Sequence, residues 1–439
     1  MSQPEPDTAR PRSFSRLRAR LATLFAAVML AGGATDAAAQ APPAPAAAAN
    51  QCATCHAGLP GTAAALDVAA DVHGSRGFTC TDCHGGDAAA TDRARAHDPR
   101  QGYRGVPAGA AVITTCARCH ADGVVMRRYA PAQRIDQAAE YATSVHGQRL
   151  ASGDAKVATC VSCHGGHGVR KVSDPKSPVY ALNVATTCAR CHADPAHMAG
   201  YQTPAGPLPT TQFAAYQESV HFKALTEKQD LSAPTCNDCH GNHGAAPPGA
   251  GAVTNVCGTC HAVFAEKFAV SPHKDVFERG CIECHDNHRI AEPTDAMLGA
   301  TEGTLCATCH ADDAGAKAAT AMRGHIETLR ATVERADTRL AQVRNAGLEV
   351  GEHELKLREA RNHLVLTRTE VHGFREEAVA KVAGEGLAIA SAVEAAADAG
   401  TQELSFRRQG LALSMGAILL VVLALLLKIR SIERRPPAA

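Results

Sequence analysis

Apolar residues are spread unevenly along this chain of 439 residues. A short apolar run covers residues 21–31, and a longer run without any charge covers residues 410–427. Residues 326–404 instead carry apolar positions at steps of three and four. The segment from residue 52 to residue 310 is rich in Ala, Gly and Pro. These patterns predict four different kinds of structure, which are taken in turn below.

The steps of three and four predict long helices. The apolar positions of the first helix are Ile326, Leu329, Val333, Leu340 and Val343. Residues 345–347 and Gly351 interrupt the pattern, and a second helix is predicted over residues 352–398. Two long helices with a short link form an antiparallel hairpin, which we expect at residues 326–404. This hairpin packs on the preceding domain, acts as a stalk, or forms the contact of a homodimer.

The uncharged run at residues 410–427 predicts a transmembrane helix. At 1.5 Å per residue it spans about 27 Å, close to the thickness of the hydrocarbon core of a bilayer. The alternative is a buried helix of a soluble domain. Basic residues follow the run directly, at Lys428, Arg430, Arg434 and Arg435. The positive-inside rule therefore predicts a cytoplasmic tail at residues 428–439.

The N-terminus has the pattern of a secretory signal. Residues 10–20 are basic, the apolar run that follows is too short to span a membrane, and small residues precede Gln40. We expect a signal peptide at residues 1–39 and a flexible leader at residues 40–51. The chain is then a single-pass protein of the cytoplasmic (inner) membrane, with its main domain in the periplasm and its C-terminus in the cytoplasm.

All eighteen cysteines fall in nine Cys-x-x-Cys-His motifs, the attachment signal for c-type haem. The two thiols of each motif bind the haem covalently, and the histidine binds the iron from one face. A zinc or disulfide interpretation is disfavoured because nine motifs use every cysteine. The expected haem-binding cysteines are Cys52, Cys55, Cys80, Cys83, Cys116, Cys119, Cys160, Cys163, Cys188, Cys191, Cys236, Cys239, Cys257, Cys260, Cys281, Cys284, Cys306 and Cys309. The motif histidines are His56, His84, His120, His164, His192, His240, His261, His285 and His310.

Composition supports nine haems as the core of residues 52–325. The chain has no Trp and few other aromatic residues, so this segment lacks the side chains for an ordinary core. Buried porphyrin supplies the apolar surface instead, and we expect the segment not to fold without haem. The predicted fold is mainly α and irregular: a haem-stacked cytochrome domain, the helical hairpin and one C-terminal transmembrane helix. A net charge of zero indicates no nucleic-acid partner.

An internal repeat predicts the second axial ligand of each iron. Four units each hold two motifs, beginning at Cys80 and Cys116, Cys160 and Cys188, Cys236 and Cys257, and Cys281 and Cys306; the motif at Cys52 stands alone. The first motif of a unit continues to a second histidine, except in the first unit, where Asp87 stands there and His97 is the nearest replacement. The second motif of each unit is followed by one more histidine. The expected distal ligands are His73, His97, His146, His167, His221, His243, His273, His288 and His325.

Other candidate ligands fit this repeat less well. His197 is left over as a spare residue or a replacement for His97. His353, His363 and His372 lie on the second arm of the hairpin and are interpreted as ordinary polar helix positions. Met126, Met198 and Met322 do not recur at one position of the repeat. We therefore expect two histidines at each of the nine irons.

The CHGxHG and SVH segments resemble the multihaem c-type cytochromes of the cytochrome c3 and doubled-CxxCH type, over about residues 50–325. The resemblance implies multiple covalent haems with two histidine ligands each. Broader relatives include haem-based reductases of nitrite, hydroxylamine and tetrathionate. Several of those enzymes mark a catalytic haem with an altered motif such as CxxCK. Every motif of this chain ends in His, which argues against nitrite reduction.

Two histidines saturate an iron, so we expect an electron-transfer protein without a catalytic residue. The redox partners are a membrane quinol-oxidising complex or other cytochromes, with electrons passed to periplasmic or outer acceptors in anaerobic respiration. The alternative is a reductase of a small nitrogen or sulfur oxyanion with one open haem, for which the Cys80 site beside Asp87 is the first candidate. A haem-based sensor or a filament subunit is a third interpretation.

Overall fold

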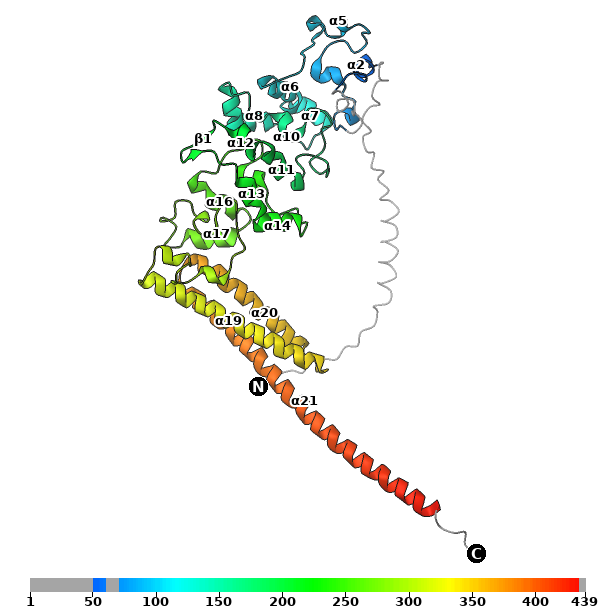
Figure 1. Ribbon diagram of the computed structural model, residues 1–439, viewed down its shortest axis with the longest axis vertical. Coiled ribbons are helices and arrows are strands. Elements are labelled where there is room, and N and C mark those ends of the chain that lie inside the picture. Colours follow the sequence, from blue (N-terminus) through cyan, green and yellow to red (C-terminus); the bar gives the residue numbers. More distant parts are fainter. Residues whose placement is uncertain (1–49, 61–70, 434–439) are drawn as a thin grey trace, which may run out of the picture. The chain divides into compact units, whose positions relative to one another are not determined.

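A computed structural model describes residues 50–60 and 71–433 (Figure 1). The predicted signal peptide, most of the leader and residues 434–439 lie outside the described residues. The described residues divide into two compact units, one with residues 50–60 and 73–106, the other with residues 71–72 and 107–433. As expected from the sequence, the described residues are mostly helical. Their one sheet pairs β1 (Gln202–Thr203) with β2 (Gly206–Pro207) antiparallel.

Short helices joined by irregular loops make up the motif-bearing part of the chain. The first unit contains α2 (Gln51–His56), η2 (Gly74–Arg76), α4 (Cys80–His84), α5 (Arg93–Ala96) and η3 (Pro99–Gln101). The second continues with α6 (Ala110–His120), α7 (Gly123–Tyr129), α8 (Gln137–Thr143), α9 (Val145–Ala151), α10 (Cys160–His164), α11 (Ala181–His192), α12 (Pro195–Met198), α13 (Gln212–Gln217), α14 (Val220–Thr226), α15 (Cys236–His240), η4 (Ala250–Ala252), α16 (Val253–Gly258), α17 (Ala262–Ala269), α18 (Ile282–His285), η5 (Asp295–Met297) and η6 (Cys306–Thr308).

Capping residues start many of these short helices. Thr79, Thr159 and Thr235 each form a capping box with the residue three positions on, directly before a motif. Asp122 and Asp194 cap α7 and α12 directly after a motif. A helix of five residues is unstable by itself, so these caps and the tertiary contacts hold the motifs in helical form.

Backbone hydrogen bonds join successive repeat units in one recurring pattern. The amide of Val145 donates to the carbonyl of Ala245 at 3.0 Å, and the amide of Val220 donates to Ile290 at 2.9 Å. The amide of Val72 makes the equivalent bond to Val169 at 2.8 Å. In each case the donor precedes a predicted distal histidine, and the acceptor lies two residues after the histidine that ends a CHxxH segment. These backbone hydrogen bonds therefore connect neighbouring repeat units.

The C-terminal part forms three helices rather than the two that the sequence predicted. They are α19 (Ala314–Asn345), α20 (Gly351–Glu370) and α21 (Glu376–Glu433), and η7 (Val371–Gly373) separates the last two. Phe374 has a φ of 52°, a left-handed conformation that ends the predicted second arm. The chain reverses there, so α20 and α21 pack on α19 as a bundle.

The bundle has an apolar core of conventional kind. Its fully buried side chains include Ile326, Leu329, Leu357, Val379 and Val393. All five predicted apolar positions of the first helix are buried. Leu355 and Leu366 are instead 60% and 50% exposed, because the turn at residues 371–375 makes α20 a separate helix with its own buried face. Gly386 permits a close approach in this core, since a Cβ there would lie 2.6 Å from Cβ of His363.

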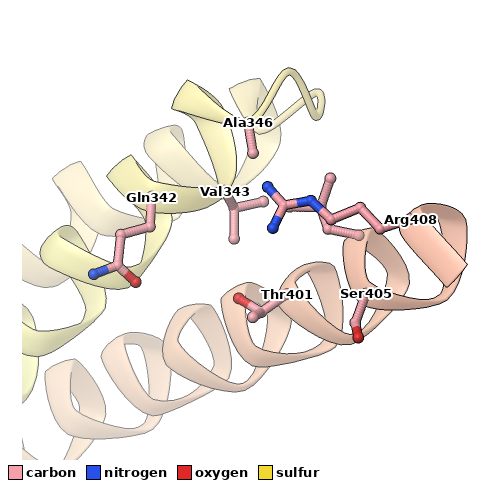
Figure 2. A pocket seen from close by; sticks show the side chains of 7 residues that line it. Gln342, Val343, Ala346, Thr401, Ser405 and Arg408 are labelled. Atoms are coloured by element: carbon pink, nitrogen blue, oxygen red, sulfur yellow. The ribbon is translucent and has the colours of Figure 1, made fainter. Parts of the chain in front are cut away.

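Helix α19 runs parallel to the first half of α21, with α20 antiparallel to both. Arg335 binds Glu394 at 3.2 Å, and Arg339 donates to Asp398 at 2.6 Å. At the end of α19, Figure 2 shows Val343 and Ala346 facing Thr401 and Arg408 of α21. The bundle therefore reaches the start of the apolar run at residue 410. That run has a mean hydropathy of 2.7 and is fully exposed, so α21 is long and apolar enough to cross a membrane.

Candidate haem-binding sites

Most motif cysteines lie on helices, and Cys260, Cys281 and Cys309 lie just outside one. All eighteen cysteines belong to the described residues, and none of them forms a disulfide. The described residues contain no group of three or more His, Cys, Asp or Glu side chains that holds a metal ion.

Seven motif histidines each face a second histidine at nearly the same distance. Their ring centroids are 6.0–6.2 Å apart, while the angle between ring planes varies from 10° to 89°. The pairs, motif histidine first, are His56 with His97, His164 with His243, His192 with His146, His240 with His288, His261 with His221, His285 with His372, and His310 with His273.

This distance fits one metal ion between two imidazoles. A metal–nitrogen bond of about 2.0 Å and about 1.1 Å from the nitrogen to the ring centre put the two centroids about 6.2 Å apart. Rotation of either ring about the metal–nitrogen axis leaves this distance unchanged. A constant distance between ring centres with variable angles between ring planes is therefore expected for two imidazoles that hold one metal ion between them. Direct stacking of the rings would not keep this distance constant.

The pairs follow the repeat. The first-motif histidines His164 and His240 face a histidine of the following unit, at His243 and His288. A second-motif histidine faces the histidine of the helix segment that precedes its own unit, as His192 faces His146. Since the last unit has no following unit, the partner of its first-motif histidine comes from elsewhere, namely from η7.

Burial favours the neutral form of these histidines, which is the form that binds a metal. It lowers the pKa of His146, His164, His192, His221, His273, His285, His288 and His372. Backbone carbonyls orient several rings through Nδ1: Gly105 lies 2.8 Å from His84, Ala246 lies 3.2 Å from His240, and Arg93 lies 2.9 Å from His97. A bonded Nδ1 leaves Nε2 to face the partner.

Successive motifs lie next to one another within each of the two compact units. In the first unit the side chain of Cys52 contacts that of Cys80. In the second compact unit, cysteines of successive motifs lie close enough for one to shift the pKa of the other: Cys116 and Cys160, Cys163 and Cys188, Cys188 and Cys236, Cys239 and Cys260, Cys257 and Cys281, and Cys284 and Cys306. Groups attached to these cysteines would be neighbours in sequence order.

Two predicted site residues have other partners. Nε2 of His325 lies 2.8 Å from Oε1 of Glu376, and no ring contact of His325 with a motif histidine is found among the described residues. Asp87 accepts hydrogen bonds from Nε of Arg95 at 3.0 Å and from the amide of Ala89 at 2.9 Å. The Ala89 amide and the Arg95 guanidinium lower the pKa of Asp87, so its carboxylate stabilises the loop.

The remaining candidates are placed as follows. His73 and His167 are the two remaining predicted distal ligands, and His84 and His120 are the two remaining motif histidines. Met126, Met198 and Met322 are buried in the apolar interior. His363 lies 3.9 Å from Glu385, a weak ion-pair distance.

His372 is the paired residue that the sequence interpretation missed. Its ring is 6.2 Å from that of His285 and nearly parallel to it, at 16°. A signal was present in the sequence, because Val precedes His in DVHG at His73, SVHG at His146, SVHF at His221 and EVHG at His372. The segment around His325, RGH, lacks this valine. The helical pattern of residues 352–398 led instead to the interpretation of His372 as an ordinary polar helix position.

A family model described as "Doubled CXXCH motif" matches residues 273–315, which hold the last two motifs. No curated protein and no solved structure matches the chain. With the nine CxxCH motifs, this match supports a c-type cytochrome of the multihaem kind, with covalently bound haem iron and a role in electron transfer.

Proposed function

We propose that this protein is a membrane-anchored multihaem cytochrome that carries electrons through nine c-type haems without transforming a substrate. The observation that carries the proposal is the set of seven histidine pairs at 6.0–6.2 Å. We assign His73 and His167 as the distal ligands of the two remaining irons. Each iron then has two imidazole ligands, and an anion has no vacant position to bind.

Haem and protein have separate roles in the proposed electron transfer. When bound, haem supplies a one-electron couple between ferric and ferrous iron. The paired histidines would hold the iron between them in either oxidation state, so the chain would rearrange little during electron transfer. The closeness of cysteines from successive motifs would place the attached groups next to one another, which supports a path along the chain.

The apolar C-terminal helix supports a location at a membrane. We propose that residues 410–427 cross the cytoplasmic membrane, with the haem domain in the periplasm and residues 428–439 in the cytoplasm. A quinol-oxidising membrane complex or another cytochrome supplies the electrons, and periplasmic or outer acceptors receive them. The bundle is available for a homodimer contact.

The reductase alternative has less support. Its first candidate was the Cys80 site beside Asp87, where other units have histidine. Asp87 is held by Arg95 and Ala89, and His97 lies opposite His56. His97 therefore takes the place of the histidine that is missing at Asp87, and it faces His56 of the lone first motif.

Intact-mass measurement of the exported protein tests the haem number. We expect the mass of the chain from Gln40 onward plus nine haems. Replacement of Cys236 and Cys239 with Ala should remove one haem. A mass with eight or fewer haems in the wild type would contradict the proposal of nine.

A further inference from the structure

We infer that His372, in the C-terminal bundle, is the sixth ligand of the haem attached to Cys281 and Cys284. This inference rests on the proposed function, because it assigns a ligand within the same chain of haems. It replaces His325, which the repeat in the sequence had suggested.

The geometry at His372 matches the other pairs. Its ring centroid lies 6.2 Å from that of His285, and Nδ1 lies 3.2 Å from the carbonyl oxygen of Thr369. Phe264 packs edge-on against the ring at 4.8 Å. The ring is therefore oriented on one side by the end of α20 and on the other side by α17.

The turn that carries His372 is firmly attached to the motif-bearing region. Lys267 of α17 binds Glu370 at 2.6 Å, and Arg368 makes two 2.8 Å bonds to the carboxylate of Asp295. Phe374 lies 4.1 Å from His273, the partner of His310. The turn at residues 371–375 thus contacts the last two haem sites, and the bundle completes the repeat where no further unit follows.

His325 differs in every one of these respects. It is bound to Glu376 through Nε2, the nitrogen that would face an iron. It is also more than a third exposed, with 38% of its side chain accessible. It lines an open hollow between α19 and α21 that is bordered by small residues such as Gly324, Ala380 and Gly384.

The test compares His372→Ala with His325→Ala in the full-length, haem-loaded protein. We expect His372→Ala to keep its haem mass and gain one high-spin haem in the electron paramagnetic resonance spectrum, which then binds cyanide. His325→Ala should stay fully low-spin. A high-spin haem in His325→Ala but not in His372→Ala would overturn the inference, and so would an unchanged spectrum in both variants.

A second variant guards against misfolding. His372→Met retains a possible ligand, so we expect one haem with thioether ligation, a near-infrared absorption band typical of methionine–iron bonds and a raised potential. Absence of that haem in a protein of normal mass would overturn the inference. Failure of the proposed function itself looks different, since the wild type would then lack haems or already contain a high-spin one.

A separate observation concerns the redox partner. The end of α19 lies next to residues 401–408 of α21, close to the apolar run (Figure 2). His372 comes just before the start of α21 at Glu376, so it lies at the opposite end of the bundle. From Glu376 to Gly410 the single helix α21 rises about 51 Å at 1.5 Å per residue. If the apolar run is the anchor, the His372 site lies far beyond the membrane surface.

We therefore infer that the chain exchanges electrons with a water-soluble redox protein or a projecting redox domain, and not directly with a quinol dissolved in the bilayer. An electron does not cross this length of protein in one step, and the bundle helices contain no CxxCH motif. This inference too rests on the proposed anchor.

Purified protein in liposomes tests this second inference. The probes are a water-soluble hydroquinone that reduces the haems and a lipid-confined hydroquinone with the same head group. We expect reduction by the soluble form to be at least about 100-fold faster, since only that form reaches the haem domain. Equal rates would overturn the inference. Deletion of residues 410–439 should leave the soluble reaction unchanged.

Discussion

Nδ1 of His310 lies 2.7 Å from Oδ2 of Asp313, so this motif histidine is bound to a carboxylate. The other motif histidines with described Nδ1 bonds, His84 and His240, are bound to backbone carbonyls. A carboxylate increases the basicity of an imidazole ligand and thereby stabilises ferric iron. The haem at Cys306 and Cys309 should consequently have a lower potential than its histidine ligands alone would give.

Replacement of Asp313 with Asn should raise the potential of that haem. Asn still caps α19, as Asp313 does through its bond to the amide of Ala316, so the fold is preserved. Loss of about 1 kcal/mol of differential stabilisation corresponds to roughly 40 mV for one electron. A spectroelectrochemical titration would reveal one component shifted upward. Asp312→Asn is the control for the loss of a nearby charge, and an equal shift there would argue against a specific bond.

Gly147→Ala should displace His146 from His192. A Cβ at residue 147 would lie 2.0 Å from the carbonyl oxygen of Tyr141, so helix α9 has to move. Overpacking of this kind costs about 1–3 kcal/mol. We expect a lower yield and one high-spin haem in what folds. Gly58→Ala is the matched control, because nothing lies within 4 Å of its Cβ, and it should behave as the wild type.

Two glycines on α21 should respond to alanine in opposite directions. Gly386 contacts His363 and Leu329 in the bundle, and Gly386→Ala should destabilise it by about 1–3 kcal/mol. Nothing lies within 4 Å of a Cβ at Gly384, so Gly384→Ala should stabilise the bundle by about 0.5–1 kcal/mol through helix propensity. Chemical denaturation followed by circular dichroism would compare them. A destabilising Gly384→Ala would contradict this account of the packing.

Deletion of residues 410–439 should release a soluble, fully haem-loaded protein. The deleted segment contains the fully exposed apolar run, whereas the bundle has its own core. Fractionation of cells after a salt wash, with haem staining, provides the measurement. Retention of the truncated protein in the membrane fraction would show that the bundle or a partner is the anchor.

Prediction of the distal ligands from the sequence relies on a pattern that repeats along the chain. The nine motifs indicate haem attachment directly. The repeated segments that follow the motifs led to the prediction of His146, His221, His243, His273 and His288, each of which lies opposite a motif histidine. His97 was found as a replacement for the histidine missing at Asp87. These ligands are local to a unit or to its neighbour, so the repeat contains the necessary information.

The repeat carries no information about a contact that depends on where the repeat ends. His325 occupies the expected position in sequence, but α19 has already begun and directs it to Glu376. His372 is separated from His285 by the whole of α19 and α20. Its position depends on the left-handed turn at Phe374, which the helical pattern of residues 352–398 did not reveal. Only tertiary packing brings those two histidines together.

Electron paramagnetic resonance of the oxidised wild-type protein tests the central claim most directly. Paired histidines at every iron predict that all nine haems are low-spin and that added nitrite, sulfite or cyanide does not bind rapidly. The nearly parallel rings of His240 and His288 and the perpendicular rings of His310 and His273 should also give distinct low-spin signals. A native high-spin haem that binds one of these anions would contradict the account and favour a reductase.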